Sequence, residues 1–256
     1  MAFADRSNVN GADDYAVARK AGLAALYLKV TEGVSFVDKT YNERRQAAQA
    51  AGIKLVGGYH FADLDDPVEE ANFFLANLVK PQVGNLLPVL DLERGKVVTD
   101  VKWAEAFVTR VKAVLGYYPA IYGSTSLISP LRAQSAILRA CPYWRAEYGI
   151  NDGADHPLQG GEQGAALHQF TSVGRFPGLS GNVDLNHFLH PTAMLVPHRK
   201  RGRRFGHKAW LWAAWYVGVG RFKGEGRVRR FRPRVPLRVP KRWWKLVAWY
   251  AQHTKR

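Results

Sequence analysis

Two carboxylates stand one residue apart in the stretch from Leu86 to Glu93, which reads LLPVLDLE. Apolar residues lead into Asp91 and Glu93, so the stretch reads as a buried strand whose end places both acids on one face. Carboxylates held this close repel each other, and one of them tends to keep its proton. A protonated acid beside an ionised one suits the cleavage of a glycosidic bond.

Polar and aromatic side chains also stand at the ends of other apolar segments. Two further acids, Asp5 and Asp184, stand at such ends. The other candidate pocket residues at strand ends are Tyr59, Tyr122, Tyr148 and Gln169. If the strands close into a barrel, these ends meet at one mouth. Aromatic faces stack on sugar rings and exclude water, and crowded acids raise the pKa of a proton donor. The pattern therefore predicts a sugar-sized pocket.

Residues 1–196 alternate short apolar runs with longer amphipathic segments, which predicts an α/β fold. We expect strands at 2–5, 24–30, 54–61, 86–92, 119–122, 143–148, 165–170 and 183–188, and helices at 13–21, 41–51, 67–79 and 101–115. This alternation favours an irregular, TIM-like (β/α) barrel of parallel strands in which the later helices are short or absent. The rival is an open doubly wound sheet, but no Gly-rich phosphate loop follows the first strand.

Other chemistries find little support in the sequence. His60, His168, His187 and His190 lack a ligand spacing such as HExxH, so we expect no metal and no cofactor. The stretch YGSTS around Ser124 does not match the G-x-S-x-G elbow of serine hydrolases. Cys141 is the single cysteine, which excludes an internal disulfide, and we expect it to pack as a small apolar residue.

Six motifs follow one another over about residues 1–190. They are DRSNVNG at 5–11, KVTEG at 29–33, GGYHF at 57–61, PVLDLE at 88–93, YWRAEYG at 143–149 and HQFTSVGRFPGLSGNVDLNHF at 168–188. In this order and spacing they resemble the glycoside hydrolase family 25 lysozymes, which include many phage endolysins. The last motif is the most specific.

The resemblance implies an N-acetylmuramidase on a flattened barrel, which cuts the β-1,4 bond between N-acetylmuramic acid and N-acetylglucosamine in peptidoglycan. It also implies that Glu93 is the general acid, that Asp91 is its partner acid, and that Asp5 and Asp184 line the pocket. Two roles stay open for Asp91: it acts as a nucleophile, or it orients the substrate's 2-acetamido group for attack. The alternatives are an inactive wall-binding barrel and, less favoured, a chitinase-like enzyme.

Two positions depart from the family pattern. Arg6 stands where a small or aliphatic residue is usual, and it either lowers the pKa of Asp5 or points away from the pocket, as strand alternation predicts. Phe170 replaces the usual tyrosine of the last motif and removes a hydroxyl. Two further acids have plain structural interpretations, Glu32 as a solvated turn residue and Glu147 as an ion-pair partner.

The charge is divided unevenly along the chain. Residues 1–196 hold 18 Lys and Arg against 20 Asp and Glu, whereas residues 197–256 hold 19 against one, within a total of +16. Six of the eight tryptophans also lie in the last stretch. We therefore expect a catalytic barrel at 1–196, followed by a cationic, Trp-rich tail at 197–256.

The tail ends in KRWWKLVAWYAQH, a candidate basic amphipathic helix that starts near Pro240. Such a helix lies well on a membrane surface, and the residues expected to bind there are Lys241, Arg242, Trp243, Trp244 and Lys245. We favour binding to anionic envelope polymers or lipids, over a disordered extension that binds polyanions without specificity and over nucleic-acid binding through Arg and Trp. No obligate protein partner is evident.

The amino terminus, MAFADRSNVNG, has neither the basic nor the apolar region of a signal peptide. The longest apolar stretch of the tail, residues 209–220, is shorter than the roughly 20 residues of a membrane-spanning helix. We expect synthesis in the cytoplasm, in a phage-infected bacterial host, and action on the cell wall.

Overall fold

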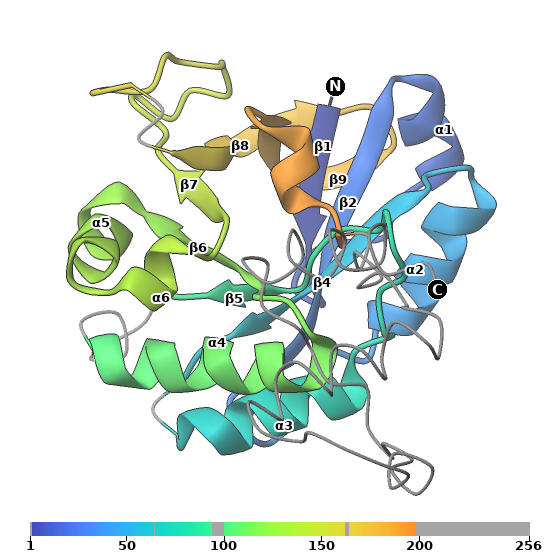
Figure 1. The fold of residues 1–256 in the computed structure, drawn as a ribbon. Helices are drawn as coiled ribbons and strands as arrows, with labels where there is room; N and C mark the ends of the chain where they lie inside the picture. Colours follow the sequence, from blue (N-terminus) through green and yellow to red (C-terminus); the bar gives the residue numbers. More distant parts are fainter. Residues whose placement is uncertain (1, 64, 94–99, 162–163, 198–256) are drawn as a thin grey trace, which may run out of the picture. The chain divides into compact units, whose positions relative to one another are not determined.

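Eight strands of the computed structural model close into a barrel with helices on its outside (Figure 1). The structure describes residues 2–63, 65–93, 100–161 and 164–197, which belong to one compact unit, Met1–His198. Every residue expected to bind the envelope, from Lys241 to Lys245, lies outside the described residues, as does the rest of the tail beyond residue 197.

The strands follow the order β1, β9, β8, β7, β6, β5, β4 and β2 around the barrel, and pairing of β2 with β1 closes the ring. They are β1 (Ala2–Arg6), β2 (Leu23–Glu32), β4 (Leu55–Phe61), β5 (Val89–Asp91), β6 (Ala120–Ser124), β7 (Tyr143–Ala146), β8 (Ala165–Phe176) and β9 (Leu179–Phe188). A short strand, β3 (Phe36–Val37), pairs with β2 outside the ring. All eight expected strands are therefore present, and the open doubly wound sheet is excluded.

The expectation that all strands run parallel is wrong for β9. This strand is antiparallel to both neighbours, β8 and β1, so the barrel is mixed. Only Pro177 and Gly178 connect β8 to β9, which suffices for a hairpin, whereas a parallel crossover needs a dozen residues or more. Gly178 has a φ of +83°, and a Cβ there would lie 2.4 Å from the Asp14 carbonyl oxygen, so the turn requires glycine.

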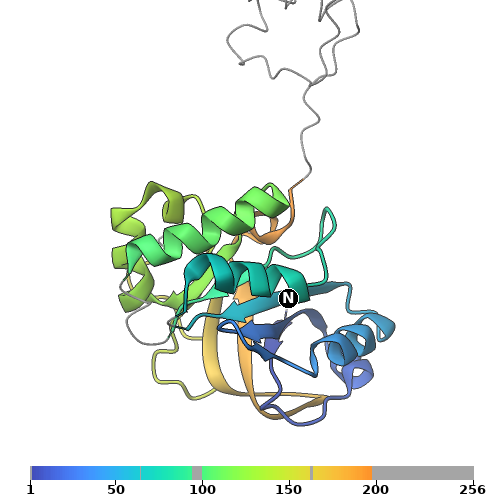
Figure 2. The ribbon, with the colours of Figure 1, turned by 90° about the horizontal axis from the view of Figure 1, so that it is seen from below.

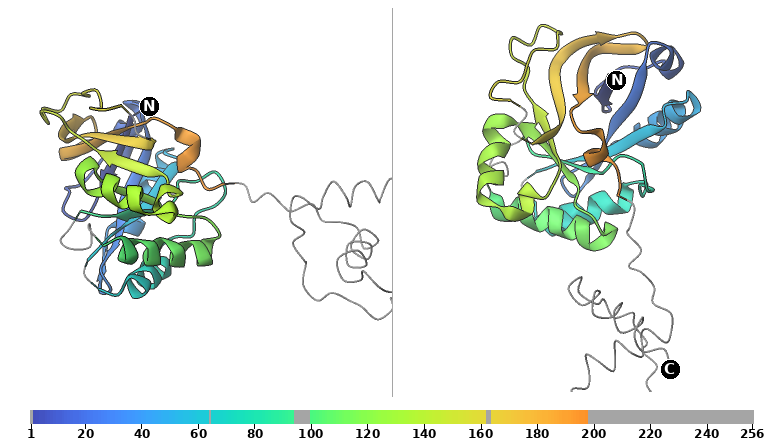
Figure 3. Two further views of the ribbon diagram at one scale, coloured as in Figure 1. Left: turned by 60° about the vertical axis from the view of Figure 1, so that its left-hand side comes forward. Right: turned by 45° about the horizontal axis from the view of Figure 1, so that its top comes forward.

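The helices pack on the outside of the barrel, and no α-helix of the described chain lies along β8 and β9, although the 3-10 turn η2 (Pro191–Met194) contacts β8 (Figures 1 and 3). Helices α1 (Tyr15–Lys20), α2 (Tyr41–Ala50), α3 (Pro67–Asn77) and α4 (Val101–Leu115) match the expected segments. Figure 2 shows α3 and α4 side by side. The later helices α5 (Thr125–Gln134), α6 (Ala136–Arg139) and the 3-10 turn η2 (Pro191–Met194) are shorter than α4, and α5 was not expected.

Helix α4 shows why these segments fold where they do. Asp100 accepts a hydrogen bond from the Trp103 backbone N–H and caps the first turn, and Gly116 ends the helix with a φ of +88°. Between these caps one face is buried against the barrel. That face includes Ala104, Val108, Val111 and Leu115. Among the described residues, no helix combines the length and apolar character needed to cross a bilayer.

The barrel interior is filled by aromatic side chains below the mouth. Phe3, Tyr27 and Trp144 pack against one another with ring centroids 5.0–5.4 Å apart, and Tyr122 meets Trp144 at 4.8 Å. All four are nearly or fully buried. They form a closely packed aromatic layer beneath the pocket, which holds the polar side chains at the strand ends in place.

Arg6 points away from the mouth, as strand alternation predicted. Its Nη2 donates to Asp13 Oδ1 at 2.7 Å and to the Ser180 carbonyl oxygen at 2.6 Å. Arg44 Nη1 reaches the other Asp13 oxygen at 2.6 Å. One buried carboxylate therefore holds two guanidinium groups and ties β1 to α2 and the β9 hairpin.

We expect Asp13→Asn to lower the free energy of unfolding by about 3 kcal/mol, because it leaves two guanidinium groups without a counter-charge in a site with almost no solvent. Chemical denaturation checks this. Asp14→Asn is a matched control at the exposed cap of α1, where asparagine caps equally well and the change stays near zero. Equal stability of the two variants would contradict the structural role of Asp13.

Candidate active site

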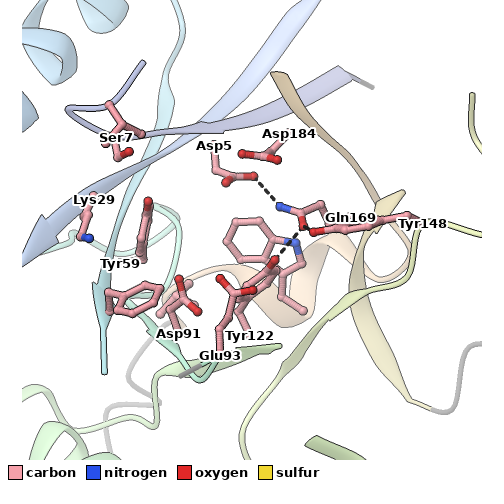
Figure 4. A pocket seen from close by; sticks show the side chains of 14 residues that line it. Asp5, Ser7, Lys29, Tyr59, Asp91, Glu93, Tyr122, Tyr148, Gln169 and Asp184 are labelled. Carbon is pink, nitrogen blue, oxygen red and sulfur yellow. Dashed lines mark hydrogen bonds between the residues drawn. The ribbon is translucent and has the colours of Figure 1, made fainter. Parts of the chain in front are cut away.

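One pocket opens at the barrel mouth and holds every residue predicted to act there (Figure 4). Its volume is about 240 Å³. The lining residues are Asp5, Ser7, Val9, Lys29, Tyr59, Phe61, Val89, Asp91, Glu93, Tyr122, Trp144, Tyr148, Gln169 and Asp184. Residues that are up to 179 positions apart in sequence are thus brought to a single hollow, as the closed barrel requires.

Strand β5 positions the acid pair. Val89 and Asp91 face the barrel interior, and Leu90 packs outward in the layer beneath the helices. Asp91 is 6% exposed, and its Oδ1 has no hydrogen-bond partner among the described residues. Glu93 continues the same face two residues later and is more exposed, although the surrounding pocket residues partly desolvate its carboxyl group. The pair therefore consists of one nearly buried acid and one more exposed acid, and both line the pocket.

Burial raises the pKa of both members of this pair. At Asp91 the rise is large, because repulsion from Glu93 and Asp5 adds to burial, while the nearby Lys29 opposes it. Burial also raises the pKa of Glu93, although a hydrogen bond with Asp91 and the charge of Lys29 reduce the rise. Because the two groups interact, they titrate together, and the pair retains a proton at a pH where an isolated carboxyl group has lost it.

A second pair of acids faces the first across the pocket. Asp5 of β1 lies directly opposite Asp184 of β9 in the antiparallel ladder. Gln169 Nε2 and Asn186 Nδ2 donate to Asp5 Oδ1 at 3.1 and 2.9 Å. Burial, followed by the charge of Asp184, raises the pKa of Asp5 well above its usual range, and the two amide donors partly offset this.

Ionisation of Asp184 is unfavourable in the folded protein. Burial, and then the charge of Glu93, raises its pKa from 3.8 to about 6. Because its pKa is higher in the folded than in the unfolded chain, the folded state binds this proton more tightly. Asp184 therefore destabilises the fold above pH 6, and this cost disappears as the pH falls towards 4.

We expect Asp184→Asn to raise the free energy of unfolding by about 1–3 kcal/mol at pH 8 and to leave it nearly unchanged at pH 4. Thermal unfolding at the two pH values measures the difference. Asp152→Asn is a suitable control, because Asp152 is exposed and its pKa is lowered, not raised, by hydrogen bonds. A stabilisation that is equal at both pH values would contradict the raised pKa of Asp184.

Hydroxyl groups and rings complete the wall. Tyr122 and Tyr148 both donate to Gln169 Oε1, at 2.7 and 2.5 Å, so this amide connects two tyrosines to Asp5 (Figure 4). Burial raises the pKa of each of these tyrosines, as it does for Tyr59, so their hydroxyls keep their protons and act as donors. The pocket therefore offers carboxylates, neutral donors and aromatic faces, and its chemistry suits a sugar.

Sequence reasoning missed several residues of the site, and three of them, Trp144, Lys29 and Asn186, make polar contacts or carry charge there. Trp144 lies at the base of the pocket and donates through Nε1 to Asn186 Oδ1 at 2.8 Å, and Lys29 adds a positive charge near the acid pair. The period-2 rule contained a signal for two of them. Trp144 stands four residues before Tyr148, and Asn186 two residues after Asp184, so each shares a face with a predicted site residue.

Glu32, Glu147 and Phe170 are not among the lining residues. Glu32 forms an ion pair with Lys29, and Glu147 pairs with Arg145 and accepts from Thr125, which supports the structural interpretation of Glu147. Phe170 follows the inward-facing Gln169 and stacks outside the pocket on His187. The hydroxyl lost at Phe170 therefore does not belong to the pocket wall.

The fold and the site together define an α/β barrel whose mouth carries the paired carboxylates of a glycoside hydrolase. Residues 4–179 match the family model described as "Glycosyl hydrolases family 25". The chain belongs to this family.

Three similar proteins illustrate the relationship. The autolytic lysozyme of Clostridium acetobutylicum is 26% identical over 186 residues, which cover 70% of this chain and 52% of the relative, so the chain spans about half of that relative's length. The bacterial lysozyme of Streptomyces coelicolor has a solved structure that superimposes with a TM-score of 0.65, at 26% identity, over 74% of this chain and 92% of that one. The CTP1L endolysin gives a TM-score of 0.57 at 28% identity, over 73% and 66%.

Proposed function

We propose that the protein is an N-acetylmuramidase, which hydrolyses the β-1,4 bond between N-acetylmuramic acid and N-acetylglucosamine in peptidoglycan. The observation that carries this is the meeting of Glu93, Asp91, Asp5 and Asp184 in one aromatic-walled pocket. Family membership and the likeness to proteins named lysozymes support the choice of peptidoglycan as substrate.

In this proposal Glu93 delivers the proton to the leaving glycosidic oxygen. It is the more exposed member of the acid pair, and the pKa of both members is raised, so the pair retains a proton that lies on Glu93 in the reacting complex. Asp91 lies behind it, buried, and in its ionised form faces the positive charge that develops at the sugar. This role holds whether Asp91 forms a covalent bond or orients the substrate's acetamido group.

The opposite wall positions the sugar. Asp5 and Asp184 accept hydrogen bonds from hydroxyl or amide groups of the substrate, and Tyr59, Tyr122 and Tyr148 supply rings and hydroxyl donors. The volume of about 240 Å³ lies just below the range of roughly 300–1,000 Å³ for sites that enclose a whole drug-sized ligand. The pocket accordingly holds one sugar unit, and the rest of a glycan strand extends along the surface.

Digestion of purified peptidoglycan tests the proposal. Incubation with the full chain is expected to release soluble fragments whose masses correspond to disaccharide units that still carry their peptides. Release of free peptides would instead indicate an amidase, and binding without release would indicate an inactive wall-binding barrel. Chitin serves as a second substrate, and faster release from chitin would favour a chitinase-like activity.

We also propose that the tail targets the enzyme to an anionic envelope and that the protein is of the phage-endolysin type. The charge division along the sequence supports the first part, and likeness to the CTP1L endolysin supports the second. A full chain with Lys241, Arg242 and Lys245 changed to Gln is expected to digest soluble glycan normally and to lyse cells less well. Unchanged lysis would contradict targeting, and loss of binding to nucleic acid alone would favour the nucleic-acid alternative.

A further inference from the structure

A second group of chemistry-bearing side chains lies outside the pocket. Asp155, His168 and His187 bring one carboxylate oxygen and two imidazole nitrogens within 4.8 Å of one another. None of the three lines the pocket, so the activity proposed above does not use them.

Strand pairing, not sequence spacing, creates this group. His168 of β8 and His187 of β9 are direct partners in the antiparallel ladder, and their rings meet edge-to-face at 5.0 Å. Their neighbours Gln169 and Asn186 point inward and hold Asp5, so the two histidines face the outer side of the barrel. Asp155 comes from the loop between β7 and β8, which extends beside these strands (Figures 1 and 3).

His168 is prepared as a neutral ligand. Its ring is 1% exposed, and its Nε2 lies 2.7 Å from the Glu147 carbonyl oxygen. A carbonyl oxygen can only accept, so Nε2 carries the proton. With the proton on Nε2, a neutral ring presents its lone pair at Nδ1. A backbone carbonyl that fixes the far nitrogen in this way is the usual support of a metal-bound histidine.

One ring nitrogen of His187 makes no hydrogen bond among the described residues, although it lies close to Asp155. The Nδ1 atom of His187 is buried and has no hydrogen-bond partner in the described structure, although Asp155 Oδ2 lies 2.9 Å away. The two atoms are therefore close without a hydrogen bond between them. Two ligand atoms of one tetrahedral metal ion lie at a comparable separation, because each stands at about 2.0–2.2 Å from the ion.

We propose that Asp155, His168 and His187 bind a divalent transition-metal ion of the zinc class. Two imidazoles and one carboxylate form a donor set that zinc accepts, with a water molecule to complete four ligands, whereas magnesium and calcium prefer oxygen ligands. The sequence predicted no metal because it offered no local ligand spacing, and strand pairing supplies the proximity that spacing did not.

The ion would act as a clamp on the outside of the barrel. It would join the loop that follows Tyr148 to β8 and β9, whose inward residues Gln169 and Asn186 hold Asp5. No α-helix in the described part of the chain lies along these two strands, so the metal would add to their stabilisation. We expect its main effect on stability and not on the chemical step.

Titration of the full-length, chelator-treated protein with ZnCl2 in a calorimeter tests the proposal. We expect one site with micromolar or tighter affinity, a rise in the unfolding temperature with Zn²⁺, and no such response to Mg²⁺. Asp155→Asn and His187→Ala are each expected to weaken this site at least tenfold. The side chain of Asp155 is 51% exposed, so Asp155→Asn should fold even if a histidine variant does not.

His156→Ala is the matched control. His156 also contacts an aspartate, Asp152, at 2.9 Å, but no third ligand among the described residues joins this pair, so the variant should bind zinc as the parent does. It also reports on adventitious binding by other histidines of the chain. Zinc binding that survives Asp155→Asn and His187→Ala unchanged, or affinity no better than millimolar, would overturn the proposal. Both results are independent of glycosidase activity.

Discussion

Glu93→Gln is expected to lower kcat on peptidoglycan by about 10²–10⁴-fold, the contribution typical of a positioned general acid. Glutamine keeps the size of the side chain but carries no proton that it can transfer. Because Glu93 is open to solvent and supports no core packing, we expect no loss of stability and little change in binding of glycan fragments. Initial rates, thermal unfolding and fragment binding together measure this.

Two controls make the result specific. Glu43→Gln removes an exposed acid on α2 that does not line the pocket. It should leave the rate within twofold of the parent. An aryl glycoside substrate, whose leaving group departs without protonation, should recover much of the lost rate with Glu93→Gln. A variant that retains more than half of the parent's activity on peptidoglycan would rule out Glu93 as the proton donor.

Asp91→Asn is expected to lower kcat by about 10²–10³-fold, comparable to the loss of one preorganised electrostatic contact in other enzymes. Asp91 is nearly buried, and its carboxyl group interacts directly with that of Glu93. The neutral amide preserves the shape of the site but cannot stabilise a developing positive charge.

Substrates with an aryl leaving group distinguish the role of Asp91 from that of Glu93. Aryl glycosides should not recover the activity of Asp91→Asn, since the positive charge at the sugar develops whatever the leaving group is. Stability should be unchanged or slightly higher, because the variant removes the cost of a crowded, buried carboxylate. Recovery equal to that of Glu93→Gln would show that the two acids do not have the separate roles proposed here.

The sequence predicted the strands of the barrel well, because alternation of apolar and polar residues is a local property. The expected strand at 2–5 corresponds to β1 (Ala2–Arg6), and the expected helix at 101–115 to α4. The direction of β9 was missed, because alternation is the same for parallel and antiparallel strands. The short Pro177–Gly178 connection contained the missing information, since two residues cannot support a crossover.

Pocket residues that lie on the same strand could be predicted from the sequence. Contacts between pocket residues on different strands could not, because they depend on how the strands pair. Asp91 and Glu93 follow from one strand and one period. The contact of Asn186 with both Asp5 and Trp144 depends on the register of β9 with its neighbours, which no local pattern contains. The same limit hid the proximity of His168 and His187, which are 19 positions apart in sequence but paired in space.

Identification of the new reducing ends in digested peptidoglycan tests the central claim most directly. The digest is treated with borohydride, which converts each newly formed reducing sugar to its alcohol, and is then hydrolysed and analysed. If Glu93 protonates the oxygen that leaves N-acetylmuramic acid, muramicitol accumulates with wild-type protein and not with Glu93→Gln. Accumulation of glucosaminitol, or of neither alcohol while the wall dissolves, would contradict the proposed function.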